Sequence, residues 1–278
     1  MNKIDAHQHF WKFDLTRDSW ITDNMKMLRR DFLPYDLEPL LRENGFDACV
    51  VVQSDQSEEE NHFQIANAEK YPFIKGVVGW VDFQAEDVEE KLSYYSQFPK
   101  LKGFRHVLQG ESDRAFMLRP AFKRGVSKLK LFDYTYDILI FQDQLAYAKE
   151  LVSAFPDQPF VLDHLAKPDI RSGAIQEWKK NIKALAEHEN VSCKISGMVT
   201  EANWENWKVQ DFTPYLDVAV AAFGTNRIMF GSDWPVCQVA ASYKQVTDLV
   251  KDYFSSFTQN EQANFFGGNA STFYRLQE

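Results

Sequence analysis

Short apolar runs alternate with segments of helical periodicity along almost the whole chain. Several runs are apolar on both faces, as in 48–52 (Ala-Cys-Val-Val-Val), which is typical of parallel strands covered by helices. Between the runs, apolar residues recur at spacings of three and four, as in amphipathic helices. The expected strands span 3–9, 47–54, 73–81, 102–108, 135–140, 159–164, 191–196 and 228–233. Eight strand–helix units in 278 residues predict an α/β fold, a single (β/α)8 TIM barrel.

The helices expected between these strands include 86–98, 142–155, 175–189 and 214–223. No Pro/Gly/Ser-rich linker and no shift in composition divides the chain, so residues 1–278 are expected to form one domain. The stretch 11–34 is too long for an ordinary connection, and in a barrel a long loop after the first strand lies over the active-site mouth. The tail 261–276 predicts one or two helices that close the end of the barrel, with 267–269 (Gly-Gly-Asn) as the break between them.

The charge and the terminal sequence exclude several classes of partner. The net charge is −9, and Lys and Arg form no stripe, which argues against a nucleic-acid partner. No window approaches 18 uninterrupted apolar residues, and the first residues enter a strand without a signal-peptide pattern, so we expect a cytoplasmic protein with no membrane partner. The three cysteines are widely spaced, which indicates reduced core thiols. The sequence leaves the oligomeric state open.

Polar side chains stand where the expected strands end. In a barrel, the carboxyl ends of the strands form the working face, so these side chains are the candidates for a site. His62 and His188 lie instead in helical segments and are expected at the surface. The strand-end candidates, in chain order, are His7, His9, Gln53, Asp55, Trp80, Asp82, Arg105, His106, Asp163, His164, Lys194, Ser196 and Asp233.

Two histidines on the first strand and one carboxylate on the last carry the clearest chemistry. His7 and His9 are two residues apart, so in a strand they point to one face and converge on one metal ion or substrate oxygen. Asp233 facing histidines can ligate a divalent metal, or orient and deprotonate a water. The alternative for Asp233 is a helix cap, which the following Trp234-Pro235 permits.

For two pairs of neighbouring residues, the sequence does not decide which side chain points into the barrel mouth. Arg105 and His106 are neighbours in a strand and point to opposite faces, so only one enters the barrel mouth. Arg is the better hydrogen-bond donor to a carbonyl or carboxylate oxygen, because its guanidinium can donate two parallel bonds, and His is the better proton carrier. For Asp163 and His164 we favour His164, because we expect residues 165–168 to turn away and leave it at the rim.

Three tryptophans lie just beyond strands. Trp11, Trp80 and Trp234 follow the first, third and last strands. Aromatic faces at the mouth of a polar site suit stacking on a sugar or an unsaturated ring. Packing under loops is the alternative for each of them.

Taken together, these segments resemble the amidohydrolase superfamily, and within it the lactone-hydrolase branch that includes L-fuconolactonases and L-rhamnonolactonases. The resemblance covers nearly the whole chain and is carried by 5–11, 76–82, 102–109, 163–168, 193–197 and 229–237. It implies a core site of His7, His9, His164 and Asp233. It also implies a substrate pocket lined by Arg105 or His106 and by Trp234.

The sequence departs from the two-metal members of that superfamily. Those members use a lysine or glutamate on strand four as a bridge and a histidine on strand five as a ligand, whereas strand four here ends in Arg105-His106 and strand five has no histidine. The resemblance therefore implies one divalent ion, zinc being a candidate, or none. If a metal is bound, its expected ligands are His7, His9, His164 and Asp233.

The resulting functional prediction is a hydrolase that opens a small-molecule sugar-acid lactone (L-fucono-, L-rhamnono- or L-galactonolactone-like) to the aldonic acid. Asp233 is expected to activate the attacking water, Arg105 or His106 to stabilise the oxyanion, and Asp233 or a histidine such as His164 to protonate the departing ring oxygen. Two alternatives remain open: a metal-dependent decarboxylase of the same superfamily, and a barrel that binds a sugar acid without turning it over.

Overall fold

Eight parallel strands form one sheet in strictly sequential order, as the sequence predicts. The computed structural model describes residues 2–277. The sheet closes on itself, because Gln8 bridges Trp234 and the amide of His9 donates to the carbonyl of Trp234 at 2.7 Å. The strands are β1 (Ile4–Gln8), β2 (Ala48–Val52), β3 (Ile74–Gly79), β4 (Leu101–His106), β5 (Thr135–Ile138), β6 (Phe160–Leu162), β7 (Val191–Ile195) and β8 (Ile228–Phe230).

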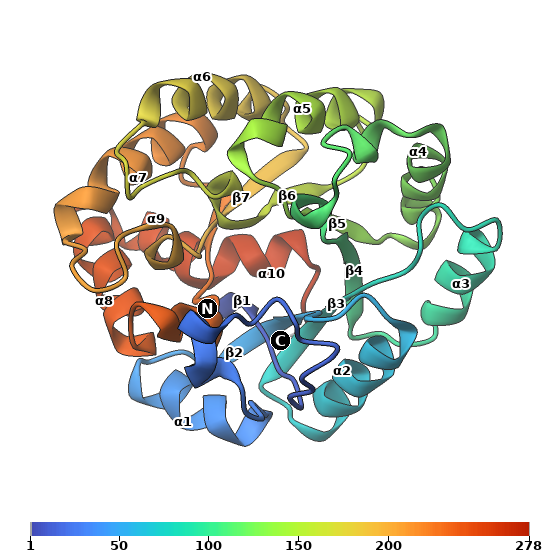
Figure 1. The fold of residues 1–278 in the computed structure, drawn as a ribbon, viewed down its shortest axis with the longest axis horizontal. Helices are drawn as coiled ribbons and strands as arrows, with labels where there is room; N and C mark the ends of the chain where they lie inside the picture. Colours follow the sequence, from blue (N-terminus) through green and yellow to red (C-terminus); the bar gives the residue numbers. More distant parts are fainter. Residues whose placement is uncertain (1, 278) are drawn as a thin grey trace.

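Helices surround the strands as an outer ring, so the molecule is a (β/α)8 barrel (Figure 1). The largest error in a predicted helix boundary is at α7, which begins five residues before Pro214, so this proline lies inside the helix rather than at its start. The helices are α1 (Pro34–Glu43), α2 (Glu58–Lys70), α3 (Val88–Tyr95), α4 (Pro120–Val126), α5 (Leu145–Ala154), α6 (Ile175–Ala186), α7 (Val209–Phe223), α8 (Tyr243–Phe254), α9 (Gln259–Ala263) and α10 (Asn269–Phe273).

The chain's tail closes the amino-terminal end of the barrel, as predicted. Tyr274 and Leu276 pack with inward-facing residues of the strands, and Leu276 approaches Gly76 near the start of β3. The glycines expected to break the tail instead belong to a π-helical turn, Asn264–Gly268, that joins α9 to α10. A side chain at Gly267 would meet the carbonyl oxygen of Asn2 at 2.0 Å, so close packing against the start of β1 explains this glycine.

Strands β6 and β8 end earlier than predicted, because the chain enters left-handed conformations there. His164, Leu165, Ala166 and Lys167 have φ between 50° and 58°, and Asp233 has φ 57°. Each non-glycine residue in this region costs roughly 1–2 kcal/mol, so such residues persist only where the surrounding structure fixes them. Both departures occur at the carboxyl end of the barrel.

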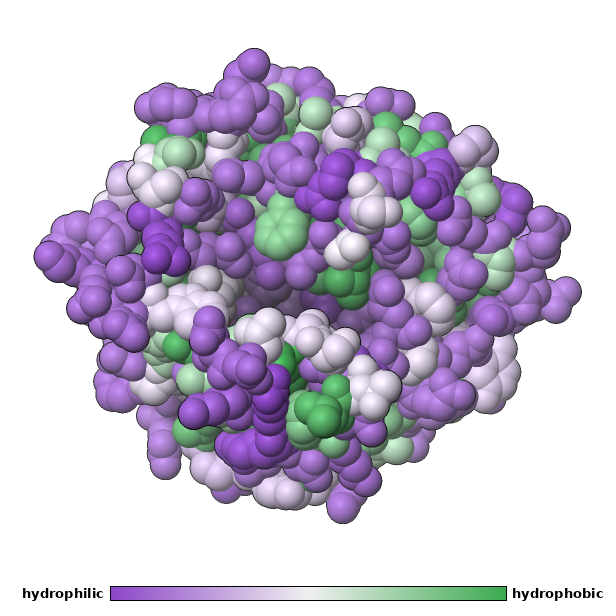
Figure 2. All heavy atoms as spheres, in the orientation of Figure 1, coloured by the Kyte–Doolittle hydropathy of each residue, from purple (hydrophilic) through white to green (hydrophobic). Residues whose placement is uncertain are grey.

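The long segment after β1 covers that same end, as predicted. Its base is fixed by paired backbone bonds between Trp11 and Phe32, and it contains one 3₁₀ helix, Asp23–Leu28. The space-filling view, in the orientation of Figure 1, shows a hollow at the centre of this face (Figure 2). None of the described helices combines the length and the apolar character needed to cross a bilayer.

Candidate active site

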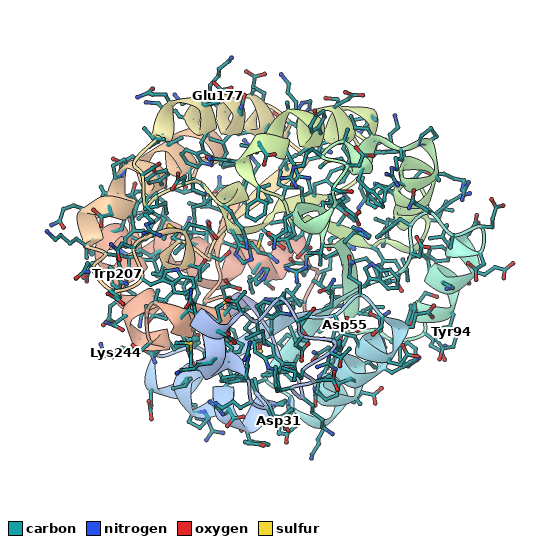
Figure 3. All side chains as sticks on the ribbon, viewed as in Figure 1. Asp31, Asp55, Tyr94, Glu177, Trp207 and Lys244 are labelled. Atoms are coloured by element: carbon teal, nitrogen blue, oxygen red, sulfur yellow. The ribbon has the colours of Figure 1, made fainter. Side chains whose placement is uncertain are left out.

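A cavity of about 400 Å³ opens at the carboxyl end of the barrel, and five of the strand-end candidates line it: His9, Asp55, Arg105, His164 and Asp233. Side chains on the outer helices, such as Glu177 and Lys244, lie at the rim of the molecule, whereas Asp55 lies nearer its centre (Figure 3). The cavity is lined by His9, Trp11, Arg17, Trp20, Met25, Ser54, Asp55, Gln56, Arg105, Val107, Gln109, Leu139, His164, Lys167, Thr200, Glu201, Trp204, Asp233, Val236 and Val239.

Three imidazoles converge on Asp233 at the floor of this cavity. Asp233 Oδ1 lies 3.3 Å from His9 Nε2, 3.8 Å from His164 Nε2 and 3.9 Å from His7 Nε2. The Nε2 atoms of His7 and His9 are 3.2 Å apart. All four side chains are buried. The structure therefore brings together strand ends from β1, β6 and β8, although His9 and His164 are 155 positions apart in the chain and His164 and Asp233 are 69 apart.

The outer nitrogen of each ring has a partner of its own, which turns Nε2 toward Asp233. His9 Nδ1 donates to the carbonyl oxygen of Val52 at 2.8 Å. His164 Nδ1 lies 2.9 Å from Ser196 Oγ. His7 Nδ1 lies 3.0 Å from Lys194 Nζ and 3.3 Å from Asp163 Oδ1. In metal sites, a partner on the nitrogen that does not face the metal fixes the orientation and the tautomer of the imidazole ring.

The donor set fits one small divalent cation. In a neutral His9, the proton given to Val52 leaves a lone pair on Nε2, which then faces the carboxylate of Asp233 with no proton between them. A cation bound between these acceptor atoms would remove the repulsion between them. A tetrahedral ion with bonds of about 2.1 Å spaces its ligands about 3.4 Å apart, close to the 3.2–3.9 Å found here. Ligand atoms of His7, His164 and Asp233 all lie within 4.8 Å of one another.

Burial and the neighbouring charges set the protonation of this cluster. Burial lowers the pKa of His7, and the Lys194 ammonium beside it lowers it further; burial also lowers the pKa of His164. For Asp233, burial acts to raise the pKa, but His164 and His9 outweigh it, and the pKa lies below its ordinary value. At neutral pH the site thus contains the Asp233 carboxylate beside neutral imidazoles at His7 and His164.

Beneath the cavity floor lies a buried network of charges. Arg105 Nη1 is 3.1 Å from Asp163 Oδ2, and Lys194 Nζ lies 3.0 Å from Asp163 Oδ1 and 2.5 Å from Asp137 Oδ2. Burial raises the pKa of Asp163, but Lys194 and His7 lower it more strongly, and its pKa is well below the ordinary value. Asp163 is therefore an anion, fully buried against Arg105 and Lys194, while its neighbour His164 lines the cavity.

The structure places Arg105 in the cavity wall and His106 outside it. The guanidinium of Arg105 is held by Asp163 and by the carbonyl and side chain of Gln53, at 2.6 and 3.1 Å from Nη2. His106 is not among the lining residues: its Nε2 lies 2.8 Å from Glu111 Oε1, and its ring stacks on Phe116. The neighbours point to opposite faces, as their alternation in β4 requires.

Of the three tryptophans predicted to bind substrate, Trp11 lines the cavity. Trp80 Nε1 donates to His106 Nδ1 at 3.3 Å, and Trp234 is buried against Phe32. Neither Trp80 nor Trp234 is among the residues that line the cavity. Trp234 is packed beneath the covering segment, which is the alternative position, and Trp80 is partly exposed. Trp20 and Trp204, which the sequence did not single out, supply aromatic surface instead.

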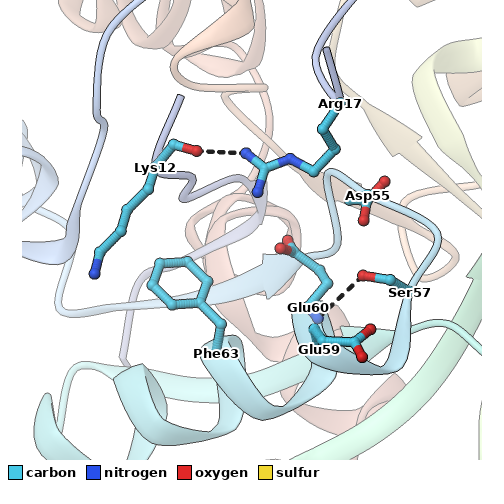
Figure 4. Close-up of a pocket in the computed structure, with 7 residues that line it drawn as sticks. All are labelled: Lys12, Arg17, Asp55, Ser57, Glu59, Glu60 and Phe63. Atoms are coloured by element: carbon cyan, nitrogen blue, oxygen red, sulfur yellow. Dashed lines mark hydrogen bonds between the residues drawn. The ribbon is translucent and has the colours of Figure 1, made fainter. Parts of the chain in front are cut away.

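Sequence reasoning also missed three charged residues of the cavity wall: Arg17, Lys167 and Glu201. Lys167 belongs to the segment expected to turn away, but the left-handed turn directs its side chain into the cavity. Arg17 lies in the covering loop and, with Asp55, also lines a neighbouring pocket (Figure 4). That pocket runs over the start of α2, where Glu60 is buried, and Asp55 is the one strand-end candidate among its lining residues.

The fold and the site together define a class: a (β/α)8 barrel with a histidine–aspartate cluster at the carboxyl ends of its strands. A family model described as amidohydrolase matches residues 4–276. The chain belongs to this amidohydrolase family.

Relatives within the family agree with the branch inferred from the sequence. An L-fucono-1,5-lactonase of Burkholderia multivorans is 38% identical, covering 99% of this chain and 97% of that protein. An L-fucono-1,5-lactonase of Burkholderia ambifaria is 33% identical, covering 99% and 96%. A crystal structure of a Burkholderia multivorans amidohydrolase with bound zinc superimposes with a TM-score of 0.97 at 38% identity, covering all of both chains. The predicted resemblance to lactone hydrolases is confirmed.

Proposed function

We propose that this protein hydrolyses the ester bond of a sugar-acid lactone and releases the aldonic acid. The observation that carries the proposal is the convergence of His7, His9 and His164 on the Asp233 carboxylate at the floor of an open cavity. Two relatives that match nearly the whole chain are L-fucono-1,5-lactonases, which supports an L-sugar lactone as substrate. A cytoplasmic location remains a prediction from the sequence.

The cavity suits a small polyhydroxylated ring. Its volume falls in the usual range for small-molecule sites, and its wall mixes charged, amide and hydroxyl groups with apolar side chains. Trp11, Trp20 and Trp204 can cover the C–H face of a sugar ring, while polar side chains such as Gln56 and Gln109 can bond its hydroxyls.

Asp233 is the proposed general base. Its lowered pKa keeps it ionised at neutral pH, and its Oδ1 lies 3.3–3.9 Å from the Nε2 atoms of the three imidazoles. The carboxylate takes a proton from the water that attacks the lactone carbonyl. The proton then passes from Asp233, or through His164, to the ring oxygen as the carbon–oxygen bond breaks. The same group thus serves as base and then as acid.

Arg105 is the proposed source of positive charge for the oxyanion. Its guanidinium is fixed by Asp163 and Gln53 before any substrate arrives, so little reorganisation is needed when negative charge develops on the carbonyl oxygen. His106 points away and has no direct part in this proposal. The buried Lys194 and Asp163 act on the reaction only by holding His7 and Arg105 in place.

His7, His164 and Asp233, with His9 beside them, would hold one divalent ion, and zinc is the candidate because a relative of the same fold binds it. Such an ion supplies Lewis acidity toward a carbonyl oxygen and lowers the pKa of water.

A pH-indicator assay over a panel of L- and D-aldonolactones tests the proposal, since hydrolysis releases acid whatever the sugar. We expect enzyme-dependent acid release from at least one L-sugar lactone. Absence of acid release from every lactone in the panel, with and without added zinc, would contradict the proposal and favour the decarboxylase or the non-catalytic alternative.

A further inference from the structure

The left-handed turn at the end of β6 presents two side chains to the cavity. His164 and Lys167 are its first and last residues, and both line the cavity, whereas Leu165 and Ala166 between them are fully buried. The turn is held by a bond from the amide of Lys167 to the carbonyl of His164 (2.7 Å), and by Trp178 Nε1, which donates to the carbonyl of Leu165 (2.7 Å).

Backbone strain of this kind is retained where the surrounding structure fixes it, and it clusters at functional sites. The proposed mechanism accounts for His164, but it leaves Lys167 without a task.

Lys167 faces Glu201 across the cavity wall without closing a hydrogen bond to it. Lys167 Nζ and Glu201 Oε1 are 3.9 Å apart, and both side chains are about one-fifth exposed. That separation is too long for a hydrogen bond, but it leaves room for a hydroxyl oxygen within about 2.8 Å of each. Among the described residues, Glu201 Oε1 has one weak donor, Thr200 Oγ1 at 3.3 Å, and the Lys167 ammonium has no hydrogen-bond acceptor.

The two groups have complementary hydrogen-bonding roles. An ammonium can only donate and a carboxylate can only accept, whereas a sugar hydroxyl does both. A single hydroxyl between them can therefore accept from Lys167 and donate to Glu201. Few neutral groups satisfy both partners, so the pair selects for a hydroxyl and rejects hydrogen or methyl at that position.

We propose that Lys167 and Glu201 form a specificity subsite that reads the configuration of one ring hydroxyl of the substrate. The inference rests on the proposed lactone hydrolysis and assigns to these two residues the choice among sugar lactones. It gives them no part in the bond-breaking steps, which belong to the Asp233 cluster.

The experiment compares Lys167→Met and Glu201→Gln with the unmodified protein on sets of lactones that differ at a single hydroxyl. Each set holds the best substrate, its epimer and the matching deoxylactone. Lys180→Met, an exposed lysine on α6, is the control for the same chemical change away from the cavity. The readouts are kcat/KM for each lactone and the affinity for the matching aldonates, measured by calorimetry.

For one hydroxyl position, we expect both variants to lose about 10- to 100-fold in kcat/KM on the best lactone, from the loss of a charge-assisted hydrogen bond. On the deoxylactone the variants should differ from the unmodified protein by less than about threefold, and discrimination against the epimer should collapse. Lys180→Met should change none of these values. An equal loss on every lactone, or unchanged discrimination at every position, would overturn the subsite.

The aldonate-binding measurement distinguishes failure of the Lys167–Glu201 subsite from failure of the proposed function. If the unmodified protein hydrolyses no lactone, the proposed function fails, but weaker aldonate binding by both variants would still support a hydroxyl-reading subsite. Unchanged aldonate binding in both variants would overturn it.

Discussion

Gly197 follows β7 with φ 61°, and it provides the space that His164 occupies. A Cβ atom built on Gly197 would lie 2.6 Å from His164 Nδ1 and 2.8 Å from its Cγ. Ordinary van der Waals contacts begin at about 3.4 Å, so in Gly197→Ala the imidazole must move by about 0.8 Å. This movement also breaks the 2.9 Å contact between His164 Nδ1 and Ser196 Oγ.

Two separable losses follow from Gly197→Ala. Alanine in the left-handed region costs roughly 1–2 kcal/mol of folding free energy, equivalent to a fall in melting temperature of about 2 to 6 °C for a chain of this size. Displacement of a reacting group by about 1 Å costs about 100-fold in rate. We therefore expect a modest loss of stability together with a fall of about 100-fold in kcat for lactone hydrolysis.

Gly45→Ala is the control. Gly45 has φ 73° at the left-handed end of α1, so alanine there carries a backbone penalty of the same kind, but no atom of the described residues lies within 4 Å of the added Cβ. Thermal unfolding and lactone hydrolysis are measured on both variants at a temperature where both are folded. Gly45→Ala should lose stability of the same order and keep its activity. Equal activities in the two variants would refute the argument that the position of His164 limits the reaction.

Three other predictions follow from the buried charges and the histidine cluster. Burial raises the pKa of Glu60, so its ionised form destabilises the fold, and the free energy of unfolding relative to Glu60→Gln should fall as pH rises through that pKa, above the unfolded value of about 4.3. Urea denaturation of both proteins from pH 4 to pH 8 measures this, and a pH-independent difference would contradict it. In Arg105→Lys, the single ammonium cannot make all the hydrogen bonds that the guanidinium makes to Asp163 and Gln53. We therefore expect at least a tenfold fall in kcat with a smaller change in KM. An unchanged kcat would remove Arg105 from the mechanism. Competition with a chelator should show one zinc ion per chain, bound at least tenfold more weakly by His164→Ala, and equal affinities would place zinc elsewhere.

Much of the architecture can be predicted from the sequence, because each unit is local. Apolar runs such as 48–52 are typical of buried parallel strands, and eight repeats of the pattern have one common closed solution. The ends of β6 and β8 could not be predicted in this way. The left-handed residues at 164–167 and 233 carry ordinary side chains, and their conformation is fixed by contacts from distant elements such as Trp178.

The candidate site could likewise be predicted from the sequence only in part. His7, His9 and Asp233 are found at strand ends by periodicity alone, and the structure brings them together. Whether Arg105 or His106 faces the cavity depends on the registration of β4 against its neighbours, which alternation leaves ambiguous. Lys167 and Glu201 lie beyond strands, at the ends of short turns where no periodicity indicates the direction of a side chain.

The most direct test of the central claim is the turnover of Asp233→Asn on the best lactone of the panel. Asparagine keeps the shape of the side chain and tolerates the left-handed φ of 57° at this position, so folding should be intact by circular dichroism and thermal unfolding. Asp252→Asn, an exposed aspartate on α8, is the control. Removal of the base should lower kcat by at least the roughly hundredfold typical of a lost general base, while Asp252→Asn keeps full activity. Near-normal turnover in Asp233→Asn would contradict the account and leave Asp233 with a structural role at the end of β8.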